Sequence, residues 1–249
     1  MANWEIDATV RVRAFDFLRR EMDRHGDGGL PRALLAEGFF FDGTRVPLLG
    51  PQGIFKPAIL DVPLSITTVP EVEGQPRPYN DAVDPSGLLT YRYRGIDPRH
   101  RDNVGLRTAM LRGLPLVYFF GVLKGVYLPV FPVRIVEDDE YGLAFKVSLE
   151  ASEAFLDNRP AADLADTIVN RRYASVVVQR RLHQLQFRER VLQAYQSQCA
   201  MCKLRHQELL DAAHIIPDSE ERGEPTVNNG LALCKLHHAA FDRHILGVR

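Results

Sequence analysis

The chain has 249 residues, of which 45% are hydrophobic and 25% are charged, as in an ordinary soluble globular protein. Its formal net charge of -1 at pH 7 excludes a protein that binds nucleic acid through its overall charge, so any basic surface must be local. No apolar run reaches the length of a membrane span, and the first residues lack the basic and apolar regions of a secretory signal. We therefore expect two domains, no membrane partner and a cytoplasmic location.

The first sixty residues predict two helices followed by short strands. Apolar positions recur at helical intervals from Ala8 to Arg24, and the glycine-rich stretch that begins at His25 ends this helix. A second helix is expected from Leu30 to Glu37, with Pro31 in its first turn. Short apolar runs broken by Gly and Pro follow up to Leu60 and indicate strands and turns.

The region from residue 65 to residue 150 is rich in predicted strands, with one helix from about Asp102 to Leu111. The pattern predicts a curved sheet or small barrel with helices against it, which ends near Glu150. The strands are expected at Ser65–Val69, Leu88–Tyr93, Pro115–Phe120, Val126–Phe131, Val133–Val136 and Leu143–Ser148.

Short motifs in this region resemble, in their order, those of the SRA domain, a PUA-like fold that reads modified cytosine in DNA. They are Pro63-Leu-Ser-Ile66, Pro78-Tyr-Asn-Asp-Ala-Val-Asp84, Leu89-Thr-Tyr-Arg-Tyr-Arg-Gly95, Asp102-Asn103 and Leu114-Pro-Leu-Val117. Two departures leave the base preference open: Arg77-Pro78 replaces a Gly-Gly pair, and Arg94 stands where a small residue is usual. The resemblance implies an SRA-like DNA-reading domain over residues 1–157, with double-stranded DNA as its partner.

The same resemblance implies a pocket for a flipped base. SRA domains stack the base between two tyrosines, and an Asp accepts a hydrogen bond from the cytosine amino group; here these are Tyr79, Tyr93, and Asp81 or Asp84. Stacking on an aromatic ring is worth about 1–3 kcal/mol per base, which offsets the cost of extruding the base. The alternative is another PUA-like or an unrelated β domain, in which both tyrosines are ordinary half-buried strand residues.

Arginines gather in two places that suit contacts with DNA phosphates. Arg92 and Arg94 flank the second tyrosine of the predicted pocket. Arg180 and Arg181 lie in a stretch from residue 171 to residue 190 that contains six arginines and one acid. We predict phosphate contacts for these four residues. The alternatives are arginines that lie over a core and a solvated helix face.

A break in the strand pattern at Asn158-Arg-Pro-Ala-Ala162 marks the expected domain junction. Apolar positions then recur at helical intervals up to Gln198, as one long helix or two. We expect a helical linker over residues 158–190 and a last domain over residues 191–249. The segment from Phe187 to Tyr195 is predicted to be a lead-in helix that packs on this last domain.

All three cysteines lie in the last domain, which indicates metal binding in a reducing compartment rather than disulfides. Cys199, Cys202, Cys234 and His237 have the ligand types and spacing of a closed tetrahedral zinc site. Such a structural Zn²⁺ stabilises a segment that has too little apolar surface to fold alone. The pair spacing favours His237 as the fourth ligand, and an exchange of roles with His238 stays open.

The zinc ligands, together with His214, Asn229 and His238, resemble the HNH (ββα-metal) nuclease family, in the subset whose finger is braced by zinc. The resemblance covers about the last fifth of the chain and implies His214 as the general base, Asn229 as the residue that holds the base-bearing loop and His238 as a ligand of a catalytic Mg²⁺ or Mn²⁺. Many members carry an Asp or His directly before the base, where this chain has Ala213. Asp211 lies on the same face of the strand and is our candidate for the second metal ligand.

The finger is expected to contain strands at Leu209–Ile216 and Gly230–Leu233 and a helix from Lys235 to about Arg243. Asp242 and His244 are interpreted as polar residues at the end of this helix, with a part in the site left open.

Together the two resemblances predict an α+β protein that acts as a modification-dependent DNA endonuclease. It would flip and read 5-methylcytosine or 5-hydroxymethylcytosine and hydrolyse DNA phosphodiesters, in the restriction of modified invading DNA. One nuclease site cuts one strand, so a double-strand break requires a homodimer or two sequential events. Two alternatives stay open: an HNH nuclease whose N-terminal domain reads unmodified sequence, another modification or RNA, and a non-catalytic DNA-binding regulator.

Overall fold

The computed structural model describes residues 3–26, 29–69, 88–149, 168–218, 220 and 222–248. The chain divides into two compact units, a first unit of residues 1–181 and a second unit of residues 182–249. No helix in the described part of the chain is long and apolar enough to cross a membrane.

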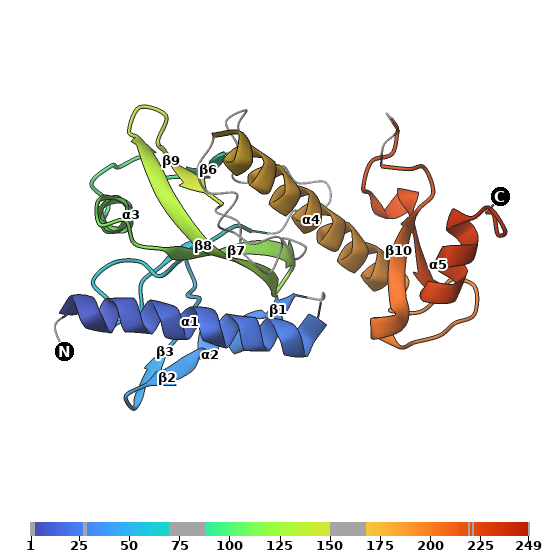
Figure 1. The fold of residues 1–249 in the computed structure, drawn as a ribbon, viewed down its shortest axis with the longest axis horizontal. Helices are drawn as coiled ribbons and strands as arrows, with labels where there is room; N and C mark the ends of the chain where they lie inside the picture. The colour runs from blue at the N-terminus through green and yellow to red at the C-terminus, as the bar shows by residue number, and fades with distance from the viewer. Residues whose placement is uncertain are drawn as a thin grey trace. The chain divides into compact units, whose positions relative to one another are not determined.

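A seven-stranded sheet forms the centre of the first unit, with the order β4-β5-β7-β8-β9-β6 and β1 paired to β8 (Figure 1). All neighbours in this sheet are antiparallel except β5 and β7, which are parallel. The strands are β1 Leu30–Pro31, β4 Ile54–Phe55, β5 Ser65–Thr67, β6 Leu88–Arg92, β7 Leu116–Leu123, β8 Val126–Asp139 and β9 Ala144–Ser148. A separate hairpin is formed by β2 Phe39–Phe41 and β3 Thr44–Val46.

The long strand β8 curls the sheet. It pairs with β7 through its first half and with β9 through its second half, and its register shifts between Ile135 and Glu137. A shift of this kind bends a strand and increases its twist. The sequence predicted two strands here, at Val126–Phe131 and Val133–Val136, and this prediction was wrong because Pro132 lies inside one continuous strand.

Helix α1, Asn3–His25, packs against β1, β2 and β8 (Figure 1). Val10, Ala14 and Leu18 follow one another at intervals of four residues and are fully buried, which confirms the helix predicted over Ala8–Arg24. Arg11 is 2% exposed, yet its guanidinium binds Asp7 and donates to the carbonyls of two loop prolines, so its charge and donors are paired.

Helix α2, Arg32–Glu37, begins two residues later than predicted. Leu30 and Pro31 are extended and pair with Tyr127 and Val126 of β8. These two residues were expected in the first turn of the helix, but they belong to the sheet. A third helix, α3, runs from Arg101 to Leu111 and packs on β8, close to the range predicted for it.

The second unit contains the end of α4, Ile168–Ala194, and a ββα arrangement of β10 Leu210–His214, β11 Gly230–Cys234 and α5 Lys235–Asp242 (Figure 1). Strands β10 and β11 form an antiparallel hairpin in which Leu210 pairs with Cys234 and His214 with Gly230. Helix α5 packs on both strands. The predicted strands and helix of the finger are therefore confirmed to within a few residues.

Helix α4 is one continuous helix, where the sequence left one or two open. Phe187, Val191 and Leu192 are at most 3% exposed and belong to the hydrophobic core of the second unit, with Leu210, Leu231 and Leu233 of the hairpin. The lead-in helix therefore packs on the finger as predicted. Fully burying an aliphatic or Phe side chain contributes about 1.5–3 kcal/mol, so this contact is a major part of the small core.

Candidate active site

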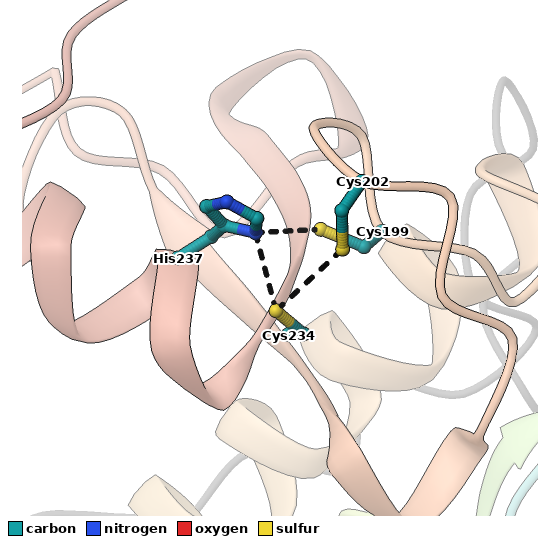
Figure 2. A group of neighbouring side chains, drawn as sticks. All are labelled: Cys199, Cys202, Cys234 and His237. Carbon is teal, nitrogen blue, oxygen red and sulfur yellow. Dashed lines mark hydrogen bonds between the residues drawn. The ribbon is translucent and has the colours of Figure 1, made fainter.

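Three cysteines and one histidine of the finger gather in one cluster (Figure 2). The ligand atoms of Cys199, Cys202, Cys234 and His237 all lie within 4.8 Å of one another. His237 Nδ1 is 3.2 Å from the sulfur of Cys234 and 3.5 Å from that of Cys199. The arrangement fits a closed structural zinc site, and the histidine in it is His237, not His238.

Backbone N–H groups around Cys199 favour the ionised form of its sulfur. Burial opposes ionisation of this thiol, but backbone N–H groups of Cys202, Cys234 and Met201 at the sulfur outweigh burial and lower its pKa to about 6. The thiolate is the form that binds a metal. Two backbone hydrogen bonds fix the turn. The N–H of Cys199 donates to the carbonyl of Leu204, at 2.9 Å, and the N–H of Ala200 donates to the carbonyl of Ala232 in β11, at 2.8 Å.

His214, the predicted general base, is the last residue of β10. Its imidazole lies over the ring of Phe187 in α4, with ring centroids 4.0 Å apart and an interplanar angle of 18°. Its Nε2 is buried and has no hydrogen-bond partner among the described residues. The stacking contact, rather than a polar partner, therefore sets the orientation of this ring.

Gly230, opposite His214 in the hairpin, allows α4 to lie this close. A Cβ at this position would come within 2.3 Å of Val191 Cγ2 and 3.0 Å of Phe187 Cζ. Any larger residue would push the helix away from the hairpin and separate Phe187 from His214. This glycine is needed for close packing and not for its backbone angles.

Asn229 fixes the segment that follows His214. Its Oδ1 accepts a hydrogen bond from the N–H of Ile216, at 2.8 Å, and its Nδ2 donates to the carbonyl of the same residue, at 2.9 Å, and to that of Glu224, at 3.0 Å. Its own carbonyl accepts from Ile215, at 2.9 Å. These contacts are those of a residue that holds the loop after the proposed base.

Asp211 and His238 come together from β10 and α5, with Oδ2 and Nδ1 3.6 Å apart. On the other side of the ring, Nε2 is 3.6 Å from Oδ2 of Asp242. The contact with Asp211 raises the pKa of His238, and the charge of Asp242 adds to this effect against the opposing effect of burial. The sequence interpretation took Asp242 as a polar residue at the end of the helix and left a part in the site open; its spacing of four residues from His238 on one helix was the signal for such a part.

The carboxylate of Asp211 is held in its ionised form. Burial acts to raise its pKa, but the contact with His238, the N–H of Ala212 and the charge of Arg188 outweigh burial and lower it. Carboxylate oxygens bind hard divalent cations such as Mg²⁺ and Mn²⁺, and neutral imidazole nitrogens bind divalent transition-metal cations. The pair of Asp211 and His238 therefore fits the predicted site for a catalytic cation.

In the first unit, Tyr79, Asp81 and Asp84 of the predicted base pocket lie outside the described residues. Tyr93 is 2% exposed, and its ring centroid lies 4.7 Å from that of Phe145. Its hydroxyl is bound to Asp138 and accepts from Arg107. Burial and the bond to Asp138 raise the pKa of Tyr93 to about 12, so this tyrosine is neutral at any physiological pH.

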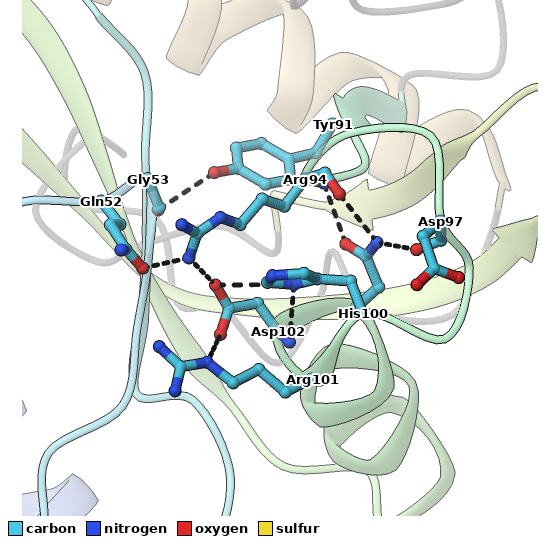
Figure 3. A network of polar contacts seen from close by, with 9 residues as sticks. Gln52, Gly53, Tyr91, Arg94, Asp97, His100, Arg101 and Asp102 are labelled. Carbon is cyan, nitrogen blue, oxygen red and sulfur yellow. Dashed lines mark hydrogen bonds and ion pairs between the residues drawn. The ribbon is translucent and has the colours of Figure 1, made fainter.

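A cavity of about 250 Å³ lies where β6 and the loop after it face β4 and β5. Tyr93 contributes to its wall, and so does Tyr91, whose hydroxyl donates to the carbonyl of Gly53 at 3.0 Å (Figure 3). The sequence interpretation missed Tyr91. The signal was its spacing of two residues from Tyr93, which places both side chains on one side of an extended chain.

The arginines predicted to contact DNA are found in different settings. Arg94 is bound to Gln52 and Asp102 (Figure 3), and the buried Asn103 holds its backbone. The guanidinium of Arg92 donates to the carbonyl of Gly142 at 2.8 Å. Arg180 is exposed, and the side chain of Arg181 is not among those that the structure describes. Arg92 and Arg94 both line the cavity, and their contacts with DNA stay predictions.

Comparison with known proteins identifies the second unit. Residues 199–249 match the family model described as HNH endonuclease. The chain thus carries an HNH endonuclease domain, which confirms the prediction that it is an enzyme of the DNA endonuclease class. No curated protein matches the chain.

Among solved structures, the chain is similar to one titled "Modification dependent TagI restriction endonuclease". The two share 17% sequence identity, with a TM-score of 0.23, over 73% of this chain and 66% of that one. The chain thus spans just under two thirds of the length of that protein.

Proposed function

We propose that the protein is a modification-dependent DNA endonuclease, in which the first unit reads a modified cytosine and the HNH domain hydrolyses a phosphodiester. The observation that carries the nuclease half is the ββα arrangement itself. It places His214 at the end of β10, next to a loop that Asn229 holds, and joins Asp211 of β10 to His238 of α5.

In this proposal His214 takes a proton from the attacking water through Nδ1, because Nε2 is buried. A neutral imidazole is suited to this role near pH 7, and the stack on Phe187 keeps the ring in one orientation. Asn229 keeps the adjoining backbone in place through its bonds to Ile216 and Glu224. Asp211 and His238 hold the catalytic cation. When bound, a divalent cation supplies positive charge that polarises the phosphate and stabilises the leaving oxygen.

The zinc ion bound by the cluster has a structural role and no catalytic role. Its ligands are Cys199, Cys202, Cys234 and His237. A four-ligand protein site leaves no open position for water or substrate. The cluster connects the turn after α4, the end of β11 and the first turn of α5. It therefore stabilises the elements that carry the proposed catalytic residues.

For the recognition of modified cytosine, we propose that the first unit is an SRA-like domain. Its support is the order of the motifs in the sequence and a cavity at the curled sheet that two tyrosines line. We propose that this cavity receives the flipped base, with Tyr79 as a stacking partner, Asp81 or Asp84 as the cytosine reader and Tyr93 in the wall. Extruding a base costs a few kcal/mol, which stacking and hydrogen bonds within a pocket must offset.

One HNH domain has one site for one phosphodiester. A double-strand break therefore requires two copies of the protein or two successive cuts. We propose a homodimer on DNA. A time course of nicked and linear product tests it, because two successive cuts accumulate nicked DNA first, whereas a homodimer produces linear DNA directly.

The deciding experiment compares one DNA duplex in three forms, unmodified, 5-methylcytosine and 5-hydroxymethylcytosine, in the presence of Mg²⁺ or Mn²⁺. We expect cutting of the modified forms only, and its loss in His214→Ala. His206→Ala is the matched control, because His206 is an exposed histidine of the same unit with no capping bond from its side chain.

The outcomes separate the two halves of the proposal. Equal cutting of all three duplexes would keep the nuclease and remove the reader of modified cytosine. Equal cutting by wild type and His214→Ala would remove His214 as the base. Binding of DNA without any cutting, by a folded protein with zinc bound, would identify a regulator instead of a nuclease.

A further inference from the structure

Arg188 of α4 contacts the start of β10 and the segment before it through Nη2 and Nε of its guanidinium. Its Nη2 donates to the carbonyls of Leu210, at 3.0 Å, and Gln207, at 3.3 Å. Its Nε lies 3.7 Å from Oδ1 of Asp211. The side chain is 16% exposed. One arginine therefore hydrogen-bonds the backbone that leads into Asp211 and forms an ion pair with the carboxylate of Asp211.

The two oxygens of Asp211 face different partners. Oδ1 faces Arg188 and accepts a hydrogen bond from the N–H of Ala212, at 2.8 Å. Oδ2 faces Nδ1 of His238, at 3.6 Å. With Oδ1 engaged on the side of α4, the rotation of the carboxylate is restricted, and Oδ2 is the oxygen presented toward His238.

Glu189 balances the charge of Arg188. Nη1 of Arg188 lies 2.6 Å from Oε1 of Glu189, whose side chain is 9% exposed. An unbalanced guanidinium next to a cation site would repel the cation and weaken its binding. The neighbouring carboxylate offsets this repulsion, so Arg188 can supply donors and a fixed geometry without a net positive charge.

From these contacts we propose that Arg188 is a positioning residue that holds Asp211 in the orientation in which it binds the catalytic cation. The inference rests on the proposed function, in which Asp211 and His238 are the cation ligands. Groups that orient a ligand in this way affect metal affinity or activity by about 10–100-fold. The fork of a guanidinium makes several contacts at once, and the single ammonium of a lysine cannot reproduce them.

The test measures Mn²⁺ binding by the full-length, zinc-loaded protein without DNA, from the electron paramagnetic resonance signal of free Mn²⁺. We expect Arg188→Ala to bind Mn²⁺ about 10–100-fold more weakly than wild type. We expect Arg188→Lys to be weakened as well, although it keeps the charge. Arg205→Ala is the matched control, since Arg205 is an exposed arginine of the same unit, and its affinity should equal that of wild type.

Asp211→Ala and His238→Ala separate the inference from the function on which it rests. If both bind Mn²⁺ weakly while Arg188→Ala and Arg188→Lys bind it as wild type does, Arg188 is not a positioning residue and the ion site stands. Tighter binding by Arg188→Ala would also overturn the inference, because Arg188 would then act only as a repelling charge. If neither ligand variant is weakened, the ion site is wrong and the inference falls with it.

The zinc content of each variant shows whether the finger is folded. If Arg188→Ala does not retain zinc, Arg188→Lys with full zinc content carries the test alone. Weaker Mn²⁺ binding by this variant supports the positioning role, and unchanged binding overturns it.

Discussion

The ring of Phe187 lies over the imidazole of His214, with centroids 4.0 Å apart and planes inclined by 18°. The two residues belong to different elements, α4 and β10, and the contact exists because Gly230 lets the helix approach the hairpin. A helix that carries the chain into the finger thus also orients the proposed general base.

Replacing Phe187 by Leu should slow strand cleavage about 10–100-fold, because the imidazole loses its flat support and samples other orientations. The rate is measured as single-turnover nicking of a modified duplex. A matched control is Val191→Ala, which removes a buried contact near Gly230 and leaves the stack in place. Both variants should lower the unfolding temperature of the second unit. Equal loss of rate in the two would show that packing in general, and not the stack, matters.

Replacing Asn229 by Asp should impair cleavage without weakening Mn²⁺ binding. The change removes the Nδ2 donor and leaves the carbonyls of Ile216 and Glu224 facing a carboxylate oxygen. An unsatisfied buried polar group costs about 1–3 kcal/mol, so the unfolding temperature of the second unit should fall as well. Asn228→Asp at the exposed neighbouring position is the control and should behave as wild type. Unchanged cleavage by Asn229→Asp would contradict the role of this residue.

Replacing Cys202 by Ser should remove zinc and unfold the second unit, while the sheet of the first unit stays folded. Binding of a structural zinc is folding free energy for a small domain, and the ligand is exposed, so no core is disturbed by the change itself. Zinc content by mass spectrometry and limited proteolysis measure the two effects. Met201→Ser should retain both zinc and protease resistance. A Cys202→Ser protein that keeps a stable second unit would disprove the structural part of zinc.

The stability of the first unit should fall when the pH rises from 10 to 12, in part because of Tyr93. Its pKa is raised from 10.0 to about 12 by burial and by the bond to Asp138. Above pH 10 the unfolded chain loses this proton and the folded chain keeps it, so stability falls as the pH rises toward 12. Below pH 10 both states hold the proton, so the contribution of the group to stability is fully present and does not change with pH. Urea unfolding of wild type and Tyr93→Phe at several pH values measures this. An equal decline in both proteins would assign the pH dependence to other groups.

Local patterns were sufficient for the finger. Two residues separate the ligands in each pair. A turn imposes this spacing on Cys199 and Cys202, and the start of a helix imposes it on Cys234 and His237, so all four members of the cluster were predicted. Helix α1 was predicted for a similar reason, since its buried positions recur at helical intervals. In both cases the geometry depends on neighbours in the chain.

Predictions failed where partners distant in sequence decided the structure. Leu30 and Pro31 were expected to begin a helix, but they pair with β8, almost a hundred residues later in the chain. Pro132 was expected to divide a strand, but β8 continues through it and changes partner along its length. Propensity is a weak guide once a sheet offers hydrogen bonds to a segment.

The sequence by itself determined which residue types stand where: it predicted the candidate zinc ligands, the candidate base, the candidate cation ligands and an endonuclease domain that the family comparison confirms. Only the tertiary structure decided how these groups are held. The stack of Phe187 on His214 and the contact of Arg188 with Asp211 join residues more than twenty positions apart. Ligand types and spacings are written in the order of residues, whereas orientation is set by the packing of elements that meet only when the chain folds.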